Sequence, residues 1–225
     1  MNANSVVYEN VKIGKDPSIE EFAVVGKPPA GTAAGQLELL IGDSSIIRSG
    51  TIIYAGNVIG DRFQTGDYAR IREGNRIGDD VSVGGGTVVE GKCNIGNRVR
   101  IHSNCFIGEY TELEDDVWIG PGVVMTNVLH PPCPEFKKRA PLKGKKCCCG
   151  PTVKKFAVIG AGAILLPGVV IGERALIGAG AIVAKDVPAG HVLSGLAARS
   201  INAVGELVCP LGLYEKGAVY KWRRK

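Results

Sequence analysis

An aliphatic side chain recurs at every sixth position along most of the chain. Three rows carry this pattern: Ile13, Ile19 and Val25; every sixth residue from Ile41 to Met125; and every sixth residue from Val153 to Val183. Thr65 interrupts the longest row but keeps its phase. Neither the 3.6-residue period of a helix nor the two-residue period of a strand produces such a repeat. A parallel β-helix does, because each six-residue unit forms one flat side of a coil.

The other positions of the repeat favour the same fold. Glycine often follows the aliphatic residue, as at Gly60 and Gly78, and small or β-branched residues such as Thr87 and Cys93 take the fifth position. The first and fifth positions would point inward, large then small, as a thin prism requires. Three repeats make one coil, so residues eighteen apart should stack. The sequence therefore predicts an all-β solenoid of about eight coils.

Domain organisation follows from the extent of the repeats. We expect one solenoid over residues 1–190, with loop insertions near 27–40 and 129–152 where the phase breaks, and a short helix with a basic tail over 191–225. A hydrophobic content of 45% with 6% aromatics fits a thin aliphatic core. Insertions of this kind form loops on one face of a solenoid, often the binding face. We interpret the second loop, which contains HPPCPEFKKRAPLKGKKCCCG, as functional.

Composition also bears on compartment and partners. No stretch approaches the ~20 apolar residues of a membrane span, and the opening MNANSVVYEN lacks a basic region followed by an apolar run. Seven cysteines without a framework spacing favour reduced thiols, so we expect a cytoplasmic protein. The net charge of +5 is concentrated in the second loop, which includes Lys137 and Arg139. These cations are either simply solvated or attract a polyphosphate ligand. Nucleic acid is disfavoured because no aromatic residues interleave with them.

Polar residues of several types are expected to converge near this loop. Asn127 should stack one coil above Glu109, and His102 and Asn104 should lie close to the same corner. The loop that carries His130 leaves the solenoid just after Asn127. This convergence marks the candidate active site.

Two segments resemble a known family. Residues Thr111–Pro131 read TELEDDVWIGPGVVMTNVLHP and resemble N-acetyltransferases that modify nucleotide-linked amino sugars for O-antigen and other surface polysaccharides. Residues Ile159–Pro188 are similar to the acetyl-CoA-binding end of the hexapeptide-repeat acyltransferases, which fold as left-handed parallel β-helices. The following GLAARSI is similar to the family's G-x-P-A-R-x-I, with Ala197 in place of the proline.

The resemblance implies an acetyl-CoA site between neighbouring subunits of a homotrimer. Backbone groups around Ala161 and Ala179 would line the pantetheine arm, and Lys185 and Arg199 would approach the nucleotide phosphates. The acceptor implied is a dTDP- or UDP-linked amino sugar. We expect the loop cations Lys137 and Arg139 to contact its diphosphate, and Glu109 and Asn127 to contact the sugar.

The reaction could proceed with or without a protein base. Related acyltransferases with a His–acid pair place it where this chain has Ser103 and Asn104, which disfavours an imidazole base there, although His102 is adjacent. His130 precedes a proline, as the histidine of galactoside and maltose O-acetyltransferases does, and is a candidate base. Alternatively, Asn104 holds a sugar amine, which is a competent nucleophile once deprotonated by desolvation.

Other functions are also compatible with the sequence. One is an O-acetyltransferase of the galactoside, maltose or serine type that uses His130, and another is a non-catalytic β-helix scaffold subunit. A zinc-dependent carbonic anhydrase is disfavoured because the three histidines lie in separate contexts. Cys133 and the Cys147–Cys149 run match no standard zinc spacing, so we expect no metal. Cys93 and Cys105 fall on inward positions and should belong to the core.

Overall fold

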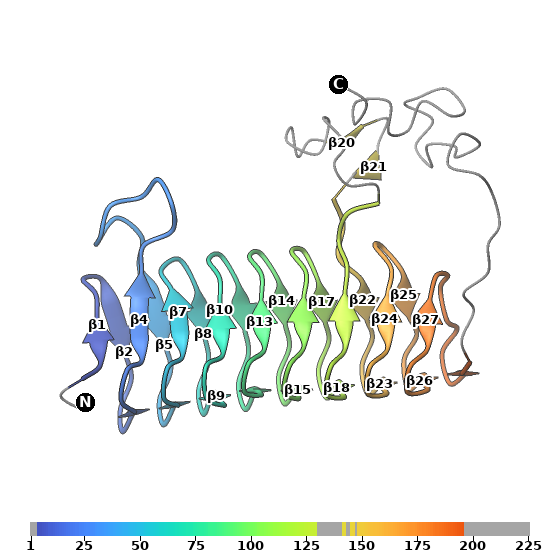
Figure 1. Cartoon of the computed structure of the whole chain (residues 1–225), viewed down its shortest axis with the longest axis horizontal. Coiled ribbons are helices and arrows are strands. Elements are labelled where there is room, and N and C mark those ends of the chain that lie inside the picture. Colours follow the sequence, from blue (N-terminus) through green and yellow to red (C-terminus); the bar gives the residue numbers. More distant parts are fainter. Residues whose placement is uncertain (1–3, 130–140, 143–144, 147, 196–225) are drawn as a thin grey trace.

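The chain folds as a long prism with three flat sides. The computed structural model describes residues 4–129, 141–142, 145–146 and 148–195, and every regular element within these ranges is a strand (Figure 1). The chain passes from sheet A to sheet B to sheet C and back to sheet A, coil after coil. The sheets hold nine, eight and nine strands, so the solenoid is about nine coils long, one more than the repeat predicted. The predicted all-β, left-handed parallel β-helix is confirmed.

The strands are short, and most contain two residues. Sheet A consists of β1 (Val6–Val7), β4 (Val24–Lys27), β7 (Ile52–Tyr54), β10 (Arg70–Ile71), β13 (Val88–Val89), β16 (Phe106–Ile107), β19 (Val124–Met125), β24 (Ile164–Leu165) and β27 (Ile182–Val183). Sheet B consists of β2 (Val11–Ile13), β5 (Leu39–Ile41), β8 (Val58–Ile59), β11 (Arg76–Ile77), β14 (Asn94–Ile95), β17 (Glu112–Leu113), β22 (Thr152–Val153) and β25 (Val170–Ile171). Sheet C consists of β3 (Ser18–Ile19), β6 (Ile46–Ile47), β9 (Gln64–Thr65), β12 (Ser82–Val83), β15 (Arg100–Ile101), β18 (Trp118–Ile119), β23 (Val158–Ile159), β26 (Leu176–Ile177) and β28 (Val192–Leu193). A separate hairpin pairs β20 (Pro141–Leu142) with β21 (Lys145–Lys146).

The register follows the predicted spacing of eighteen residues. Ile77 pairs with Ile95 and Ile101 with Ile119, each in parallel. Met125 pairs with Leu165 across the second insertion, so the coils continue as if the insertion were absent. Both insertions lie between a sheet A strand and a sheet B strand and therefore leave the prism at the same edge (Figure 1).

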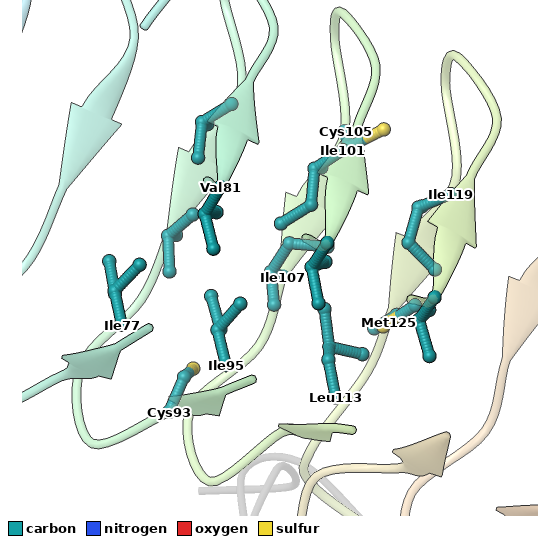
Figure 2. Close-up of a cluster of buried hydrophobic side chains, with 14 of the residues drawn as sticks. Ile77, Val81, Cys93, Ile95, Ile101, Cys105, Ile107, Leu113, Ile119 and Met125 are labelled. Carbon is teal, nitrogen blue, oxygen red and sulfur yellow. The ribbon is translucent and has the colours of Figure 1, made fainter. Parts of the chain in front are cut away.

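The core is a single column of side chains along the prism axis. In most two-residue strands of the solenoid the second side chain points inward and is buried, while the first faces outward. Figure 2 shows Ile77, Ile95 and Ile101 pointing into the prism from their strands. Cys93 and Cys105 fill the small inward positions and are 0% and 2% exposed, so the predicted core role of both is confirmed.

A buried amide ladder runs inside the edge between sheets A and B. The Asn57 side-chain oxygen accepts a 2.7 Å hydrogen bond from the Asn75 backbone N–H. The Asn75 oxygen in turn accepts one of 2.7 Å from the Cys93 backbone N–H, and its amide nitrogen donates to Arg72 O. Polar groups buried in an aliphatic prism must be paired, and this ladder pairs them between coils.

Carboxylates form a second ladder on the edge between sheets B and C. The backbone N–H of Asp61 donates to Asp79 Oδ1 at 2.9 Å, and that of Asp79 donates to Asn97 Oδ1 at 2.9 Å. Each carboxylate lies so close to the coil before it that a Cβ on Gly60 would meet Asp79 Oδ1 at 2.2 Å. Glycine in the second repeat position is therefore required by the stacking itself.

The ends of the solenoid fit the predicted organisation in part. The first insertion occupies residues 28–38, between β4 and β5. Strand β28 extends sheet C to Leu193, beyond the expected boundary at residue 190. The expected C-terminal helix and tail lie outside the described residues from 196 onward. Within the described ranges, the chain has no helix that could cross a bilayer.

Replacing Asn75 with Leu should destabilise the fold. The side chain is 1% exposed, and its loss leaves the Cys93 N–H and the Arg72 carbonyl without partners in the core. Two such losses cost about 2–5 kcal/mol. Denaturant unfolding followed by circular dichroism measures the change. The matched variant Asn94→Leu, on the exposed side of sheet B, should shift stability by less than about 0.5 kcal/mol. Equal effects of the two variants would show that the buried ladder contributes little.

Candidate functional site

Four of the predicted site residues lie on one edge of the prism. We call this edge the C–A corner: the turns that join each sheet C strand to the next sheet A strand, residues 20–23, 48–51, 66–69, 84–87, 102–105, 120–123, 160–163 and 178–181. His102 and Asn104 share one turn, and Ala161 and Ala179 belong to the last two. These residues are far apart in the sequence, but the strand register stacks their turns in one row along the edge.

Backbone hydrogen bonds tie the turns of this corner into a continuous ladder. The bonds run from Asn104 N–H to Gly85 O (2.9 Å), from Gly122 N–H to Ser103 O (3.0 Å), from Gly162 N–H to Pro121 O (2.9 Å) and from Gly180 N–H to Ala161 O (2.8 Å). Adjacent coils are ~4.8 Å apart, so the turn of Asn104 lies three coils, ~14 Å, from the turn of Ala179.

The C-terminal half of the corner is bare backbone. Gly122, Gly162 and Gly180 take the same turn position, with φ of 69°, 67° and 70°. A Cβ added at Gly162 or Gly180 would meet no atom within 4 Å. Ala161 and Ala179 beside them are exposed. The corner therefore offers a smooth track against which a slender ligand chain can lie.

Asn104 stands where this bare track begins. Its backbone has φ 59°, in the left-handed region that Asn tolerates better than most residues, so a turn role accounts for part of its presence. The side chain is exposed and lies over the preceding coil, with Oδ1 2.5 Å from the position a Cβ on Gly86 would take. The amide is thus available to a ligand at the end of the track.

His102 lies beside Asn104 but faces sheet C. The imidazole is exposed and packs against Trp118 with ring centroids 4.7 Å apart at an angle of 58°. Trp118 itself is on the outward side of sheet C, in register with Arg100 and Val158. The ring of His102 is therefore oriented by a neighbour one coil away.

Glu109 and Asn127 lie at a different edge, and the expectation that His102 and Asn104 share their corner is wrong. The strand β16 separates Asn104 from Glu109, five residues or ~16 Å along an extended chain. Asn127 does lie one coil above Glu109, as predicted, because Ile107 pairs with Met125. Its amide nitrogen donates to Cys148 Sγ at 3.2 Å. Within one subunit, the predicted constellation is divided between two edges.

The remaining predicted residues are also divided. Lys185 is exposed but follows β27, so it lies at the same edge as Glu109, at the opposite end of the strand from Ala179. His130, Lys137, Arg139 and Arg199 lie outside the described residues, and their predicted roles stay predictions.

A groove on sheet C, next to Asn104, was not anticipated. It has a volume of about 320 Å³ and is lined by Arg48, Gln64, Ser82, Arg100, His102 and Ser103, together with the backbone between them. Gln64, Ser82 and Arg100 are the outward residues of three consecutive strands. The signal in the sequence is the residue before each inward aliphatic one, which is polar in these coils.

The outward residues of sheet A form a contrasting surface. They are predominantly apolar: Val24, Ile52, Val88, Phe106, Val124, Ile164 and Ile182, with Arg70 as an exception. An apolar hollow of about 560 Å³ lies on this side, lined by Phe106, Val128, Leu129, Leu166 and their neighbours. Sheet A thus presents an apolar face that no other element of the described residues covers.

Comparison with known proteins identifies the repeat. The family model described as bacterial transferase hexapeptide (six repeats) matches residues 150–185, which contain the bare half of the C–A corner. Residues 150–185 therefore carry the repeat that this family model describes, and the predicted hexapeptide repeat is confirmed. The sequence matches no curated protein.

Solved structures share the solenoid. The UDP-N-acetylglucosamine acyltransferase of Francisella novicida has a TM-score of 0.50 at 18% identity, over 85% of this chain and 65% of that one. A serine acetyltransferase apoenzyme has a TM-score of 0.35 at 22% identity, over 61% of this chain and 42% of that one. A mutant of AntD, an N-acyltransferase from Bacillus cereus in complex with dTDP and coenzyme A, has a TM-score of 0.41 at 21% identity, over 72% and 82%. The chain therefore spans less than two thirds of the first two proteins, and at these identities the likeness establishes the fold.

Cysteine thiols and potential metal ligands are other candidate reactive groups of the chain. Within the described ranges, no three His, Cys, Asp or Glu side chains are grouped so as to hold a metal ion; His130, Cys133 and Cys147 lie outside them. Burial raises the pKa of the Cys93 thiol to about 12 and also raises the pKa of Cys105. These two thiols are therefore protonated at neutral pH and are not nucleophiles.

Cys93 should resist alkylation in the native protein. At pH 8 its raised pKa and its burial should slow reaction with iodoacetamide by on the order of a hundredfold or more relative to the unfolded chain. Peptide mass spectrometry after timed labelling measures this rate. Cys149, which is half-exposed, serves as the internal comparison and should be labelled first. Equal labelling of both in the native state would contradict the buried, protonated state of Cys93.

Proposed function

We propose that this protein is an acetyl-CoA-dependent N-acetyltransferase that acts on the amine of a nucleotide-linked amino sugar. The nucleotide would be dTDP or UDP, and the pathway the biosynthesis of O-antigen or another surface polysaccharide in the cytoplasm. The observation that carries the proposal is the continuity of the C–A corner. The bare track at Gly162 and Gly180 runs in one line to the exposed amide of Asn104.

The bare half of the corner suits the acetyl-CoA arm. A pantetheine chain is slender and carries amide groups, and it needs a smooth backbone surface with hydrogen-bonding groups beside it. The turns of Ala161 and Ala179 supply that surface, and ~14 Å of track separates Ala179 from Asn104. A thioester at the end of such an arm would lie within reach of Asn104. Lys185 lies at the opposite end of β27 from this track, so its proposed contact with the phosphates of the coenzyme would have to come from a neighbouring subunit. Arg199 keeps its proposed contact with the same phosphates.

The residues near the thioester end favour an amine as acceptor. Transfer requires the acceptor nitrogen to attack the thioester carbon, the C–S bond to break, and the nitrogen's proton to leave with the thiolate. An uncharged amine can do this without a protein base, whereas a hydroxyl requires one. Asn104 offers an amide oxygen that can accept a hydrogen bond from the amine, and Ser103 replaces the imidazole that an O-acetyltransferase would place there.

A homotrimer is part of the proposal, because the described part of the chain leaves sheet A uncovered. Val88, Phe106 and Val124 form consecutive outward positions on that sheet, and Phe106 is 37% exposed. A thin prism buries little surface by itself, so association through an apolar side is expected. A neighbouring copy would also bring its own edge toward the corner that carries Asn104. The site would then lie between subunits.

Placing a charge on the apolar face should weaken assembly. Phe106→Glu puts a carboxylate in the middle of the outward row of sheet A, where burial against a second copy would cost several kcal/mol. Light scattering coupled to size-exclusion chromatography should show a trimer for the wild type and smaller species for this variant. Asn94→Glu, on the outward side of sheet B, should remain trimeric. A monomeric wild type, or a Phe106→Glu variant that keeps the full mass, would contradict the assignment of this face.

The activity is tested with acetyl-CoA and a panel of dTDP- and UDP-linked amino sugars, with thiol release as the readout. The decisive variant is Asn104→Gly, since glycine accepts the φ of 59° and only the amide is lost. Loss of one good hydrogen bond to the reacting amine should lower kcat/KM about ten- to hundredfold. His102→Asn should have a smaller effect.

Two outcomes would overturn this mechanism or its substrate class. If His130→Asn lowers kcat/KM by more than about a thousandfold and removes the limb of the pH profile near neutrality, His130 is the base and the base-free route fails. If simple sugar hydroxyls are acetylated in preference to sugar amines, the chain is an O-acetyltransferase. Unchanged kcat/KM in Asn104→Gly would remove that residue from the site.

A further inference from the structure

The groove on sheet C has the chemistry of an anion site. Its side chains are two arginines, the hydroxyls of Ser82 and Ser103, Gln64 and His102, and no carboxylate of the described residues lines it. The hollow on sheet B around Arg76 is instead acidic, since Glu112, Glu114 and Asp115 line it. Guanidinium groups and hydroxyls donate hydrogen bonds to phosphate oxygens, and no acidic side chain in the groove competes for these donors.

Of the two arginines in this groove, Arg100 is the one whose charge is not neutralised by an ion pair within the described residues. Arg48 is bound by Glu20, with 3.1 Å between Nη1 and Oε1. Arg100 has no ion-pair partner within the described ranges. The acid that its charge influences, Asp80, is itself held by Arg62 at 2.6 Å. The guanidinium of Arg100 therefore remains available to an anionic ligand.

An exposed aromatic ring lies on the C–A corner beside the coils of this groove. Tyr68 is two residues after the groove residue Gly66 and is 75% exposed. Its ring lies along the preceding coil, where a Cβ on Gly50 would meet a ring carbon at 2.5 Å. The ring is thus placed against the corner, and a flat exposed ring of this kind can stack with a nucleobase.

The order of these features along the corner matches the order of groups in a nucleotide-linked sugar. Tyr68 lies two coils, ~10 Å, before Asn104, and the bare turn of Gly84 to Gly86 lies between them. Arg100 is the first residue of β15, and Asn104 lies in the turn that follows this strand. We infer that this groove binds the nucleoside diphosphate of the acceptor, with the diphosphate at Arg100 and the base on Tyr68. This inference rests on the proposed function and assigns its acceptor subsite.

The experiment measures binding of dTDP, UDP and inorganic pyrophosphate by calorimetry, with coenzyme A present at saturation so that its own site is filled. The variants are Arg100→Ala and Tyr68→Ala. Their matched controls are Arg76→Ala, an exposed arginine on sheet B, and Phe156→Ala, an aromatic residue that also has positive φ (59°) on another edge. The loop variant Lys137→Ala with Arg139→Ala compares the cations predicted from the sequence.

The two site variants should separate the two parts of the ligand. Arg100→Ala should weaken both the nucleotides and pyrophosphate about tenfold or more, because it removes a charge-assisted contact. Tyr68→Ala should weaken dTDP and UDP about tenfold but leave pyrophosphate unchanged, because it removes only stacking. Neither variant should change the Kd of coenzyme A more than about twofold when that is measured alone.

Three results would overturn the inference. One is an equal effect of Arg100→Ala and Arg76→Ala on nucleotide affinity. Another is loss of nucleotide affinity in the loop variant with none in Arg100→Ala. The third is loss of coenzyme A affinity in Arg100→Ala, which would assign the groove to the donor. If nucleotides bind as expected but no amino sugar is acetylated, the proposed function fails while the groove assignment stands.

Discussion

Parallel pairing between residues eighteen apart is the constraint on which this molecule depends. One coil cannot bury its aliphatic side chains alone, because two-residue strands such as Arg76–Ile77 offer one inward side chain each. Stacking provides neighbours for each inward residue and also aligns every other repeat position into a column. The chemistry of an edge is therefore decided by which residue recurs at one position of the repeat. A single register produces the core and the long surfaces of the prism together.

The edges illustrate how different such columns can be. On the edge between sheets B and C, the N–H of Asp61 and that of Asp79 donate to side chains of the following coil, so the ladder satisfies itself. On the C–A corner, the N–H of Ser103 and that of Ala161 have no acceptor within the described residues. Exposed donors beside small side chains are free to bond water or ligand. The two edges therefore differ in whether their backbone donors are already bonded, and the unbonded donors of the C–A corner support the proposed binding site there.

The sequence predicted the fold well because a six-residue period is a strong signal that few architectures produce. The same counting could have placed Asn104 on one edge with Ala161 and Ala179, since all lie in turns that follow sheet C strands. The error concerned Glu109, because Asn104 precedes β16 and Glu109 follows it, and two short strand residues suffice to carry the chain across a whole side. The groove was not predicted because the six-residue period specifies the inward residues, whereas Gln64, Ser82 and Arg100 point outward. The direction of the Tyr68 ring depends on the space above Gly50 and has no signal in the sequence.

The solenoid also explains how the proposed donor and acceptor subsites can be kept separate. Each coil contacts mainly its neighbours, so residues several coils apart are coupled weakly. The family match covers residues 150–185, which are the coils of the bare track, and it does not extend to the groove. A shared donor would hold the C-terminal coils to a common pattern, while the N-terminal coils would be free to fit different acceptors. Asn104 lies at the boundary between these halves, where a residue can contact both substrates. The outward residues Gln64, Ser82 and Arg100 are polar, and Trp118 follows them on the next strand, so the surface chemistry of sheet C changes at the level of Asn104, where the proposed subsites meet.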